Sequence, residues 1–109
     1  MNLVTKVAGV TFDNPDGSSR QEAIQGIGAS VWRGNLKEFT LEREPDNPHD
    51  PNAVKVLYDN KCVGYIPKEQ AIEVTKFVER DKVRAIQLHE TGKHEGIYFL
   101  SISMILLEN

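Results

Sequence analysis

The side chains best suited to chemistry stand in one short segment, residues 44–52, which reads Glu-Pro-Asp-Asn-Pro-His-Asp-Pro-Asn. Carboxylates, amides and one imidazole alternate there with three prolines. Each proline fixes its own φ near −65° and restricts the residue before it to extended geometry. The polar groups are therefore held in place before any ligand arrives, as in a binding loop carried by a rigid scaffold.

The composition of this loop leaves several roles open. Asp46, His49 and Asp50 are candidate metal ligands, since a histidine with two carboxylates is a sound ligand set, and a metal-dependent hydrolase is the corresponding function. The most common role of such residues is structural, in which Asp46 and Asn47 satisfy backbone groups of the turn. His49 and Asp50 are adjacent and do not face each other, so no nucleophile–base pair is predicted. The sequence therefore predicts a protein that is not an enzyme and needs no cofactor.

The composition also restricts the partners. A net charge of −3 disfavours strong binding to a long nucleic-acid backbone and leaves room only for a small, local site. No apolar stretch approaches the ~20 residues of a membrane span. The N-terminus lacks the features of a secretory signal. These features predict a cytoplasmic protein without membrane contact, and the single cysteine excludes an internal disulfide.

Strands on both sides must position the polar loop. Apolar and polar residues alternate over residues 36–43 before the loop and over 53–58 after it. Asp59-Asn60 then predicts a tight turn into a hairpin partner over residues 61–66. The loop therefore connects two strands of one antiparallel sheet.

The rest of the chain predicts three more strands and two helices. The strands are expected over residues 3–10, 83–89 and 97–107, with a hairpin loop over 91–96. In the last strand, one apolar face is expected from Tyr98, Leu100, Ile102, Met104 and Leu106. Ser19 is a candidate N-cap for a helix over 20–27 that ends at Gly26 or Gly28, and residues 29–35 are ambiguous between loop and strand. Pro67 opens a second helix that ends near Arg80 or Asp81.

These elements predict one domain, residues 1–109, of the mainly β class. About six short strands in so short a chain favour a small β-barrel with two short helices that cap its gaps. The alternative is an open antiparallel sheet with both helices on one side. Phe12, just after the first strand, is expected either to close the core or to stack on a ligand.

A resemblance to a known family sharpens this prediction. The motif Leu41–Val56, which reads L-E-R-E-P-D-N-P-H-D-P-N-A-V-K-V, is followed by Val63-Gly64-Tyr65-Ile66-Pro67 and a helix. This pattern resembles the HIRAN domain, and residues 7–10 are similar to that family's first strand. The resemblance implies an OB-like β-barrel. For the best understood members it also implies recognition of a single-stranded DNA 3′ end, in front of a SWI/SNF-type helicase in fork-remodelling proteins.

The resemblance also implies site residues. Asp50 would accept a hydrogen bond from the terminal 3′-hydroxyl, a task that suits an acceptor-only group that repels phosphate. Phe12 would match an aromatic that packs against the end bases, and His49 stands where these members usually have tyrosine. The candidates for contacting the last phosphates are Arg43, Lys55 and Lys68.

The function implied is a non-catalytic module for single-stranded DNA ends with a free 3′-hydroxyl, in DNA repair or replication-fork processing. Because the chain contains no ATPase or nuclease domain, its expected partners are helicase or nuclease proteins that act in trans. The alternative is a protein-interaction adaptor that uses the same barrel surface or an exposed strand edge.

Overall fold

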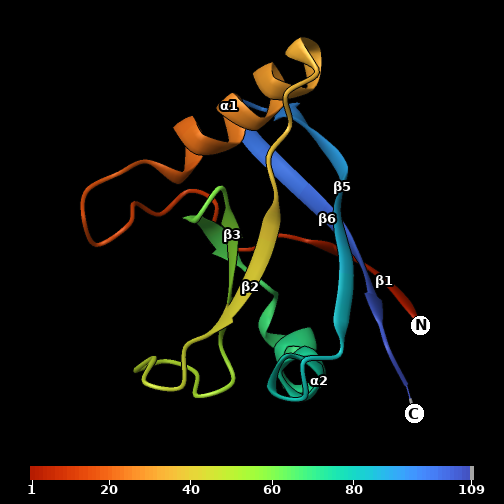
Figure 1. Ribbon diagram of the computed structural model, residues 1–109. Coiled ribbons are helices and arrows are strands. Elements are labelled where there is room, and N and C mark those ends of the chain that lie inside the picture. The colour runs from red at the N-terminus through yellow and green to blue at the C-terminus, as the bar shows by residue number, and fades with distance from the viewer. Residues whose placement is uncertain (109) are drawn as a thin grey trace.

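The computed structural model describes residues 1–108 and arranges them as two three-stranded antiparallel sheets with two helices (Figure 1). The first sheet has the order β1 (Asn2–Lys6), β6 (Ile97–Leu106) and β5 (Val83–His94). The second has the order β2 (Phe39–Arg43), β3 (Val54–Tyr58) and β4 (Lys61–Tyr65). The polar loop joins β2 to β3, as the sequence predicts.

The two sheets face each other as an OB-like barrel, which confirms the predicted fold class. Ala8 and Tyr65 join the sheets on one side, where each backbone N–H donates to the carbonyl of the other, at 2.8 and 2.9 Å. Within residues 1–108 no ladder joins β5 to β2 on the other side, so the barrel is not closed.

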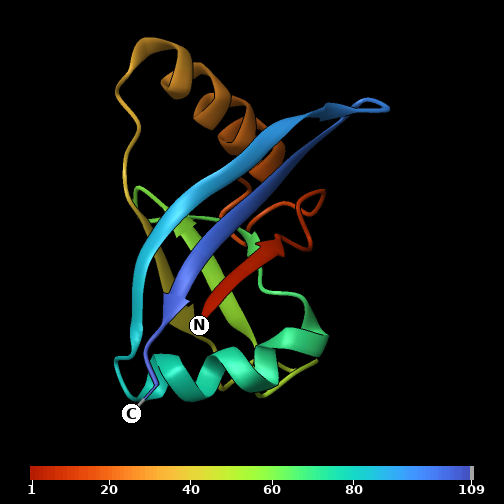
Figure 2. The ribbon, with the colours of Figure 1, turned by 90° about the vertical axis from the view of Figure 1, so that its right-hand side faces the viewer.

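The two helices cover opposite ends of this barrel (Figures 1 and 2). Helix α1 (Arg20–Arg33) packs against β4, β5 and β6, and α2 (Lys68–Glu79) packs against β2 and β3. The alternative, an open sheet with both helices on one side, is therefore wrong. Among the described residues, no helix is long and apolar enough to span a membrane.

The two sheets cross where residues 7–8 lie against residues 64–65, and this crossing depends on Gly64. A Cβ at this position would lie 2.4 Å from the carbonyl oxygen of Ala8 and 2.5 Å from Cγ1 of Val7. Only a residue without a side chain allows the backbones of residues 7–8 and 64–65 to approach so closely. The crossing brings the turn after β1 beside β4.

Helix α1 is longer than predicted. Gly26 and Gly28 do not end it, and residues 29–33, expected as loop or strand, continue the helix to Arg33. The helix ends at Gly34, which forms a left-handed C-cap with a φ of 69°. The N–H of Gly34 donates to the carbonyls of Ser30 and Val31. The predicted N-cap is confirmed, since the side chain of Ser19 accepts the N–H of Glu22.

Two strands also begin or end at other residues than predicted, because pairing with distant strands decides where they stop. The predicted first strand, residues 3–10, leaves its sheet after Lys6 because residue 8 pairs with the other sheet. Strand β5 runs through the predicted hairpin loop to His94, because its pairing with β6 continues to the turn at Glu95-Gly96. The predicted turn at Asp59-Asn60 is confirmed, with φ of 50° and 67°.

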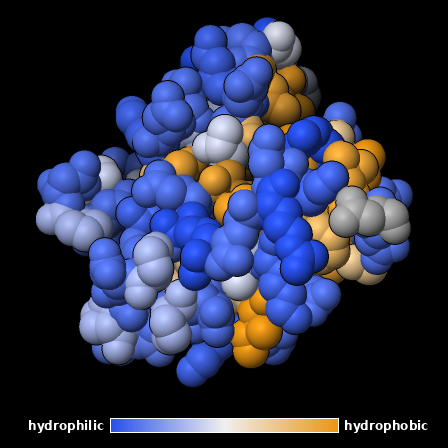
Figure 3. Space-filling model, turned by 60° about the horizontal axis from the view of Figure 1, so that its bottom comes forward, coloured by the Kyte–Doolittle hydropathy of each residue, from blue (hydrophilic) through white to orange (hydrophobic). Residues whose placement is uncertain are grey.

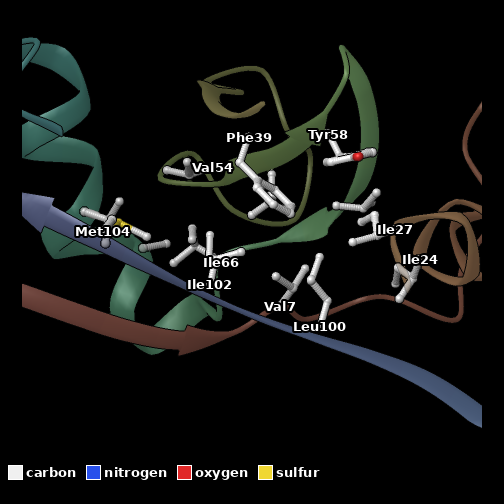
Figure 4. Packing of buried hydrophobic residues seen from close by; sticks show 14 of the residues in the cluster. Val7, Ile24, Ile27, Phe39, Val54, Tyr58, Ile66, Leu100, Ile102 and Met104 are labelled. Atoms are coloured by element: carbon white, nitrogen blue, oxygen red, sulfur yellow. The ribbon is translucent and has the colours of Figure 1, made fainter. Parts of the chain in front are cut away.

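The core lies between the two sheets and extends under α1 (Figure 4). Leu100, Ile102 and Leu106 are completely buried, which confirms the predicted apolar face of the last strand. They meet Val56 and Val63 from the second sheet within one cluster. The loops that leave this core are therefore attached to a rigid base.

Candidate functional site

A polar groove of about 870 Å³ lies over the outer face of β3 and β4. The turn of residues 9–18 borders it on one side, and Glu44, the first residue of the polar loop, lines it from the other. Lys55 and Leu57 line it from β3, and Tyr65 lines it from β4. In this strand Val54, Val56 and Tyr58 point inward, so the groove uses the opposite face of the sheet from the core.

A hydrogen-bonded network forms the floor of the groove. The hydroxyl of Tyr65 donates to both carboxylate oxygens of Glu44, at 3.0 and 3.2 Å, and Lys55 Nζ lies 3.0 Å from Oε2 of the same carboxylate. Burial raises the pKa of Glu44, but the hydrogen bonds from Lys55, Asn47 and Tyr65 outweigh it and leave the pKa below its ordinary value. Burial and the same carboxylate raise the pKa of Tyr65. Glu44 is therefore ionised and fully engaged at neutral pH.

The polar loop is braced from this network. Asn47 Nδ2 donates to Oε1 of Glu44 at 2.6 Å, while Asn47 Oδ1 accepts the backbone N–H groups of His49 and Asp50 at 2.8 and 3.1 Å. Asp50 Oδ1 accepts the N–H of Asn52 at 2.9 Å. Asn47 thus has the structural role predicted for it, and one oxygen of Asp50 is fixed while the other makes no hydrogen bond within residues 1–108.

The turn of residues 9–18 is held to β4 by the buried Arg20 and the half-buried Asn14. Arg20 is only 7% exposed, and its guanidinium lies 5.3 Å over the ring of Tyr65. Its Nε donates to Oδ1 of Asn14 at 2.8 Å and its Nη1 to the carbonyl of Gly9 at 2.9 Å. Asn14 in turn donates to the carbonyl of Cys62 at 3.0 Å. Both borders of the groove are therefore tied to the same tyrosine.

Three of the predicted site residues lie in this turn and in the polar loop, and none of the three lines the groove itself. Phe12 is 69% exposed in the turn of residues 9–18, so it does not close the core. His49 is exposed and Asp50 half-buried in the polar loop. Figure 3, which brings forward the end of the molecule where the loop and α2 lie, shows mainly hydrophilic side chains with small apolar patches.

The three predicted phosphate contacts are not gathered on one surface. Lys55 lies in the groove and is paired with Glu44. Arg43 follows the inward-facing positions of β2, and its Nη1 lies 2.6 Å from Oε1 of Glu79 on α2. Lys68 is exposed in the first turn of α2. The structure therefore separates Arg43 from Lys55 by the thickness of the sheet.

The candidate metal ligands Asp46, His49 and Asp50 do not converge. Within residues 1–108 no group of three His, Cys, Asp or Glu side chains is arranged to hold a metal ion. The hydrolase alternative therefore has no ligand set in this structure.

Sequence reasoning missed three groove residues: Arg20, Glu44 and Tyr65. Arg20 was expected only as the first residue of a helix, and Glu44 and Tyr65 only as parts of the loop and of a strand. The one indication in the sequence that could have pointed to these residues was the position of Tyr65 within the family motif Val63–Pro67. Its meeting with Glu44 and Arg20 is long-range and has no local signature.

Comparisons with known proteins show the family and the fold of this chain. The family model described as the HIRAN domain matches residues 7–102. The crystal structure of the HIRAN domain of human HLTF superposes with a TM-score of 0.58 at 21% identity, over 94% of this chain and 72% of that one. A UPF0597 protein of Finegoldia magna is 28% identical over an alignment of 98 residues, and the match covers 88% of this chain. The chain spans 23% of the length of that curated relative.

Proposed function

This chain belongs to the HIRAN domain family, and from that premise we propose that it is a non-catalytic module that binds single-stranded DNA ends with a free 3′-hydroxyl. Family membership supports DNA binding in general. The end specificity is proposed from the groove and its two borders. The proposed role is in DNA repair or replication-fork processing, with helicase or nuclease proteins as partners.

The observation that carries the proposal is the prepared state of Asp50. Its backbone N–H and Oδ1 are fixed by Asn47 and Asn52, and its other carboxylate oxygen is left for a ligand. A carboxylate accepts a hydrogen bond from a hydroxyl and repels a phosphate at the same place. Such an acceptor distinguishes a 3′-hydroxyl end from a 3′-phosphate end.

Exposed rings supply the second part of the proposal. Phe12 is free to stack on a base because most of its surface is exposed. Stacking on an aromatic ring is worth roughly 1–3 kcal/mol per base and tolerates any sequence. His49 offers a smaller ring in the same loop as Asp50, so we propose that Phe12 supplies most of the stacking energy.

The phosphate contacts proposed are Lys55 and Lys68, with Arg43 a more distant candidate because Glu79 already pairs with it. Lys55 forms an ion pair with Glu44, whereas Lys68 has no ion-pair partner among the described residues. So few basic groups suit a ligand of two or three nucleotides. The net charge of −3 agrees with a short site.

Fluorescence anisotropy with labelled ten-nucleotide oligothymidylates that differ only at the 3′ end tests the proposal. The ends are 3′-hydroxyl, 3′-deoxy and 3′-phosphate. We expect the 3′-hydroxyl end to bind about tenfold more tightly than the 3′-deoxy end, since a hydrogen bond to a charged group is worth about 1.5–3 kcal/mol. The 3′-phosphate end should bind most weakly. Equal affinity for all three ends would remove the proposed mechanism.

A second candidate, the protein-interaction adaptor, is favoured by one apolar patch. Trp32 is 92% exposed at the end of α1, beside Val31 and Leu36, which are 49% and 42% exposed. Trp32 stands twelve residues along the helix from Arg20, about 18 Å at 1.5 Å per residue. Because it is the single tryptophan, its emission should shift on binding of a protein partner and stay unchanged on binding of DNA in the groove.

A further inference from the structure

Arg20 is a buried charge without a counter-charge. It begins α1, is 7% exposed and lines the groove. Its two hydrogen-bond acceptors, Oδ1 of Asn14 and the carbonyl of Gly9, are both neutral. None of the ion pairs within residues 1–108 includes Arg20. Burial of a charge costs free energy that an opposite charge offsets, so the site favours an anion.

One nitrogen of this guanidinium is available. Nη2 of Arg20 makes no hydrogen bond in the described part of the chain. The buried side-chain atoms that lack a partner there are Arg43 Nε and Thr75 Oγ1, so Nη2 is not a buried atom. It is therefore reached by solvent, and the groove is the cavity that Arg20 lines. The ring of Tyr65 and the two acceptors fix the plane of the guanidinium, so this donor has a set direction.

We propose that Arg20 binds one backbone phosphate of the strand whose 3′ end is held at Asp50. The proposal rests on the proposed function. A planar guanidinium matches the oxygens of a phosphodiester better than an ammonium does. A continuous set of contacts runs from Asp50 through Asn47, Glu44 and Tyr65 to Arg20, so the loop that carries Asp50 is braced against the groove that Arg20 lines.

The charges around Arg20 limit the site to a single phosphate. Carboxylates of Glu42, Glu44, Asp13 and Asp16 also line the groove. Lys55 pairs with Glu44, and Lys61 also lines the groove. The hydroxyl and N–H of Ser18 donate to Asp16 at 2.6 and 2.9 Å and keep it ionised, so Asp13, Asp16 and Glu42 all repel a longer polyanion. The ligand class is therefore a short strand that crosses the groove once.

Methylphosphonate scanning tests this site. Each of the three linkages nearest the 3′ end of a ten-nucleotide oligothymidylate is replaced in turn by a neutral methylphosphonate, and Kd is measured by anisotropy. For the natural protein, one linkage should weaken binding about tenfold and the others less than threefold. The variant Arg20→Gln should bind the unmodified strand about tenfold more weakly and lose nothing further at that linkage.

Three comparisons separate a phosphate contact from a merely structural role. Arg33→Gln removes the same charge from the exposed last turn of α1 and should keep the full tenfold penalty. Arg20→Lys keeps the charge and should keep part of the penalty, and it serves if Arg20→Gln does not fold. If Arg20→Gln weakens binding but its affinity still falls tenfold when the sensitive linkage is made neutral, Arg20 only holds the turn, and the proposal is wrong.

The remaining outcomes are also decisive. Equal and small losses at all three linkages in the natural protein overturn the Arg20 site without any variant, while the preference for 3′-hydroxyl ends stands. Absence of binding to the unmodified strand overturns the proposed function and the Arg20 site together.

Discussion

Replacement of Gly64 by alanine should destabilise the fold strongly, because Gly64 lies where the two sheets cross. The added Cβ would lie 2.4 Å from the carbonyl oxygen of Ala8 and 2.5 Å from Cγ1 of Val7. The nearer atom belongs to the backbone, and its carbonyl accepts the N–H of Tyr65 at 2.9 Å. Relief of the clash must therefore lengthen or break the hydrogen bonds that join the sheets.

The expected loss follows from these contacts. Overpacking of a tight site costs about 1–3 kcal/mol, and the loss of one or two backbone hydrogen bonds adds about 1 kcal/mol each. A loss of about 3 kcal/mol is a large part of the roughly 5–15 kcal/mol that stabilises a domain of this size. The melting temperature should fall by on the order of 10–20 °C.

The matched control is Gly26→Ala, the same substitution on the exposed side of α1, where nothing lies within 4 Å of the added Cβ. Alanine in a helix interior is favoured over glycine by about 0.5–1 kcal/mol, so this variant should gain stability. Urea denaturation is followed by far-UV circular dichroism, because Trp32 is 92% exposed and reports poorly on unfolding. If the two variants differ by less than about 1 kcal/mol, the crossing adapts easily and this account of Gly64 fails.

The other predictions concern the loop, the turn and the groove. Asp50→Asn should weaken binding of 3′-hydroxyl strands about tenfold, as measured by anisotropy. The control Asp46→Asn makes the same charge change at an exposed position of the loop, and its Kd should stay within twofold of that of the natural protein. Equal losses of affinity in the two variants would contradict the acceptor role of Asp50. Phe12→Ala should cost roughly 1–3 kcal/mol of binding free energy on oligothymidylate and oligoadenylate alike, and a loss confined to one base would rule out simple stacking. Burial raises the pKa of Glu44, but hydrogen bonds from Lys55, Asn47 and Tyr65 lower it by more. The stabilisation from Glu44 is therefore present above the ordinary pKa of 4.5 and is lost as pH falls through the lowered folded pKa. The stability difference between the natural protein and Glu44→Gln in urea should therefore shrink from pH 7 to pH 3, and a constant difference would refute the linkage.

Local patterns account for the parts of the fold that were predicted. Alternation located the strands around the polar loop, and Asp59-Asn60 located the turn, because side-chain period and turn geometry depend on neighbours in sequence. The second half of α1 was missed because Gly26 and Gly28 have low helix propensity. Packing of the helix on the barrel and the cap at Gly34 outweigh that propensity.

The sequence by itself determined the loop, because its prolines, its polar groups and the family motif are all contiguous, and so Asp50 and His49 could be proposed as site residues from the sequence. Only the tertiary structure decided what the loop faces. The pairing of Glu42 with Lys55 puts Lys55 on the groove and Arg43 on the other side of the sheet, a choice made by strand register. Arg20, Tyr65 and Glu44 come from three distant segments, and the close approach at Gly64 brings the first of these segments to the other two. Contacts of that kind depend on how the sheets cross, which no local pattern contains.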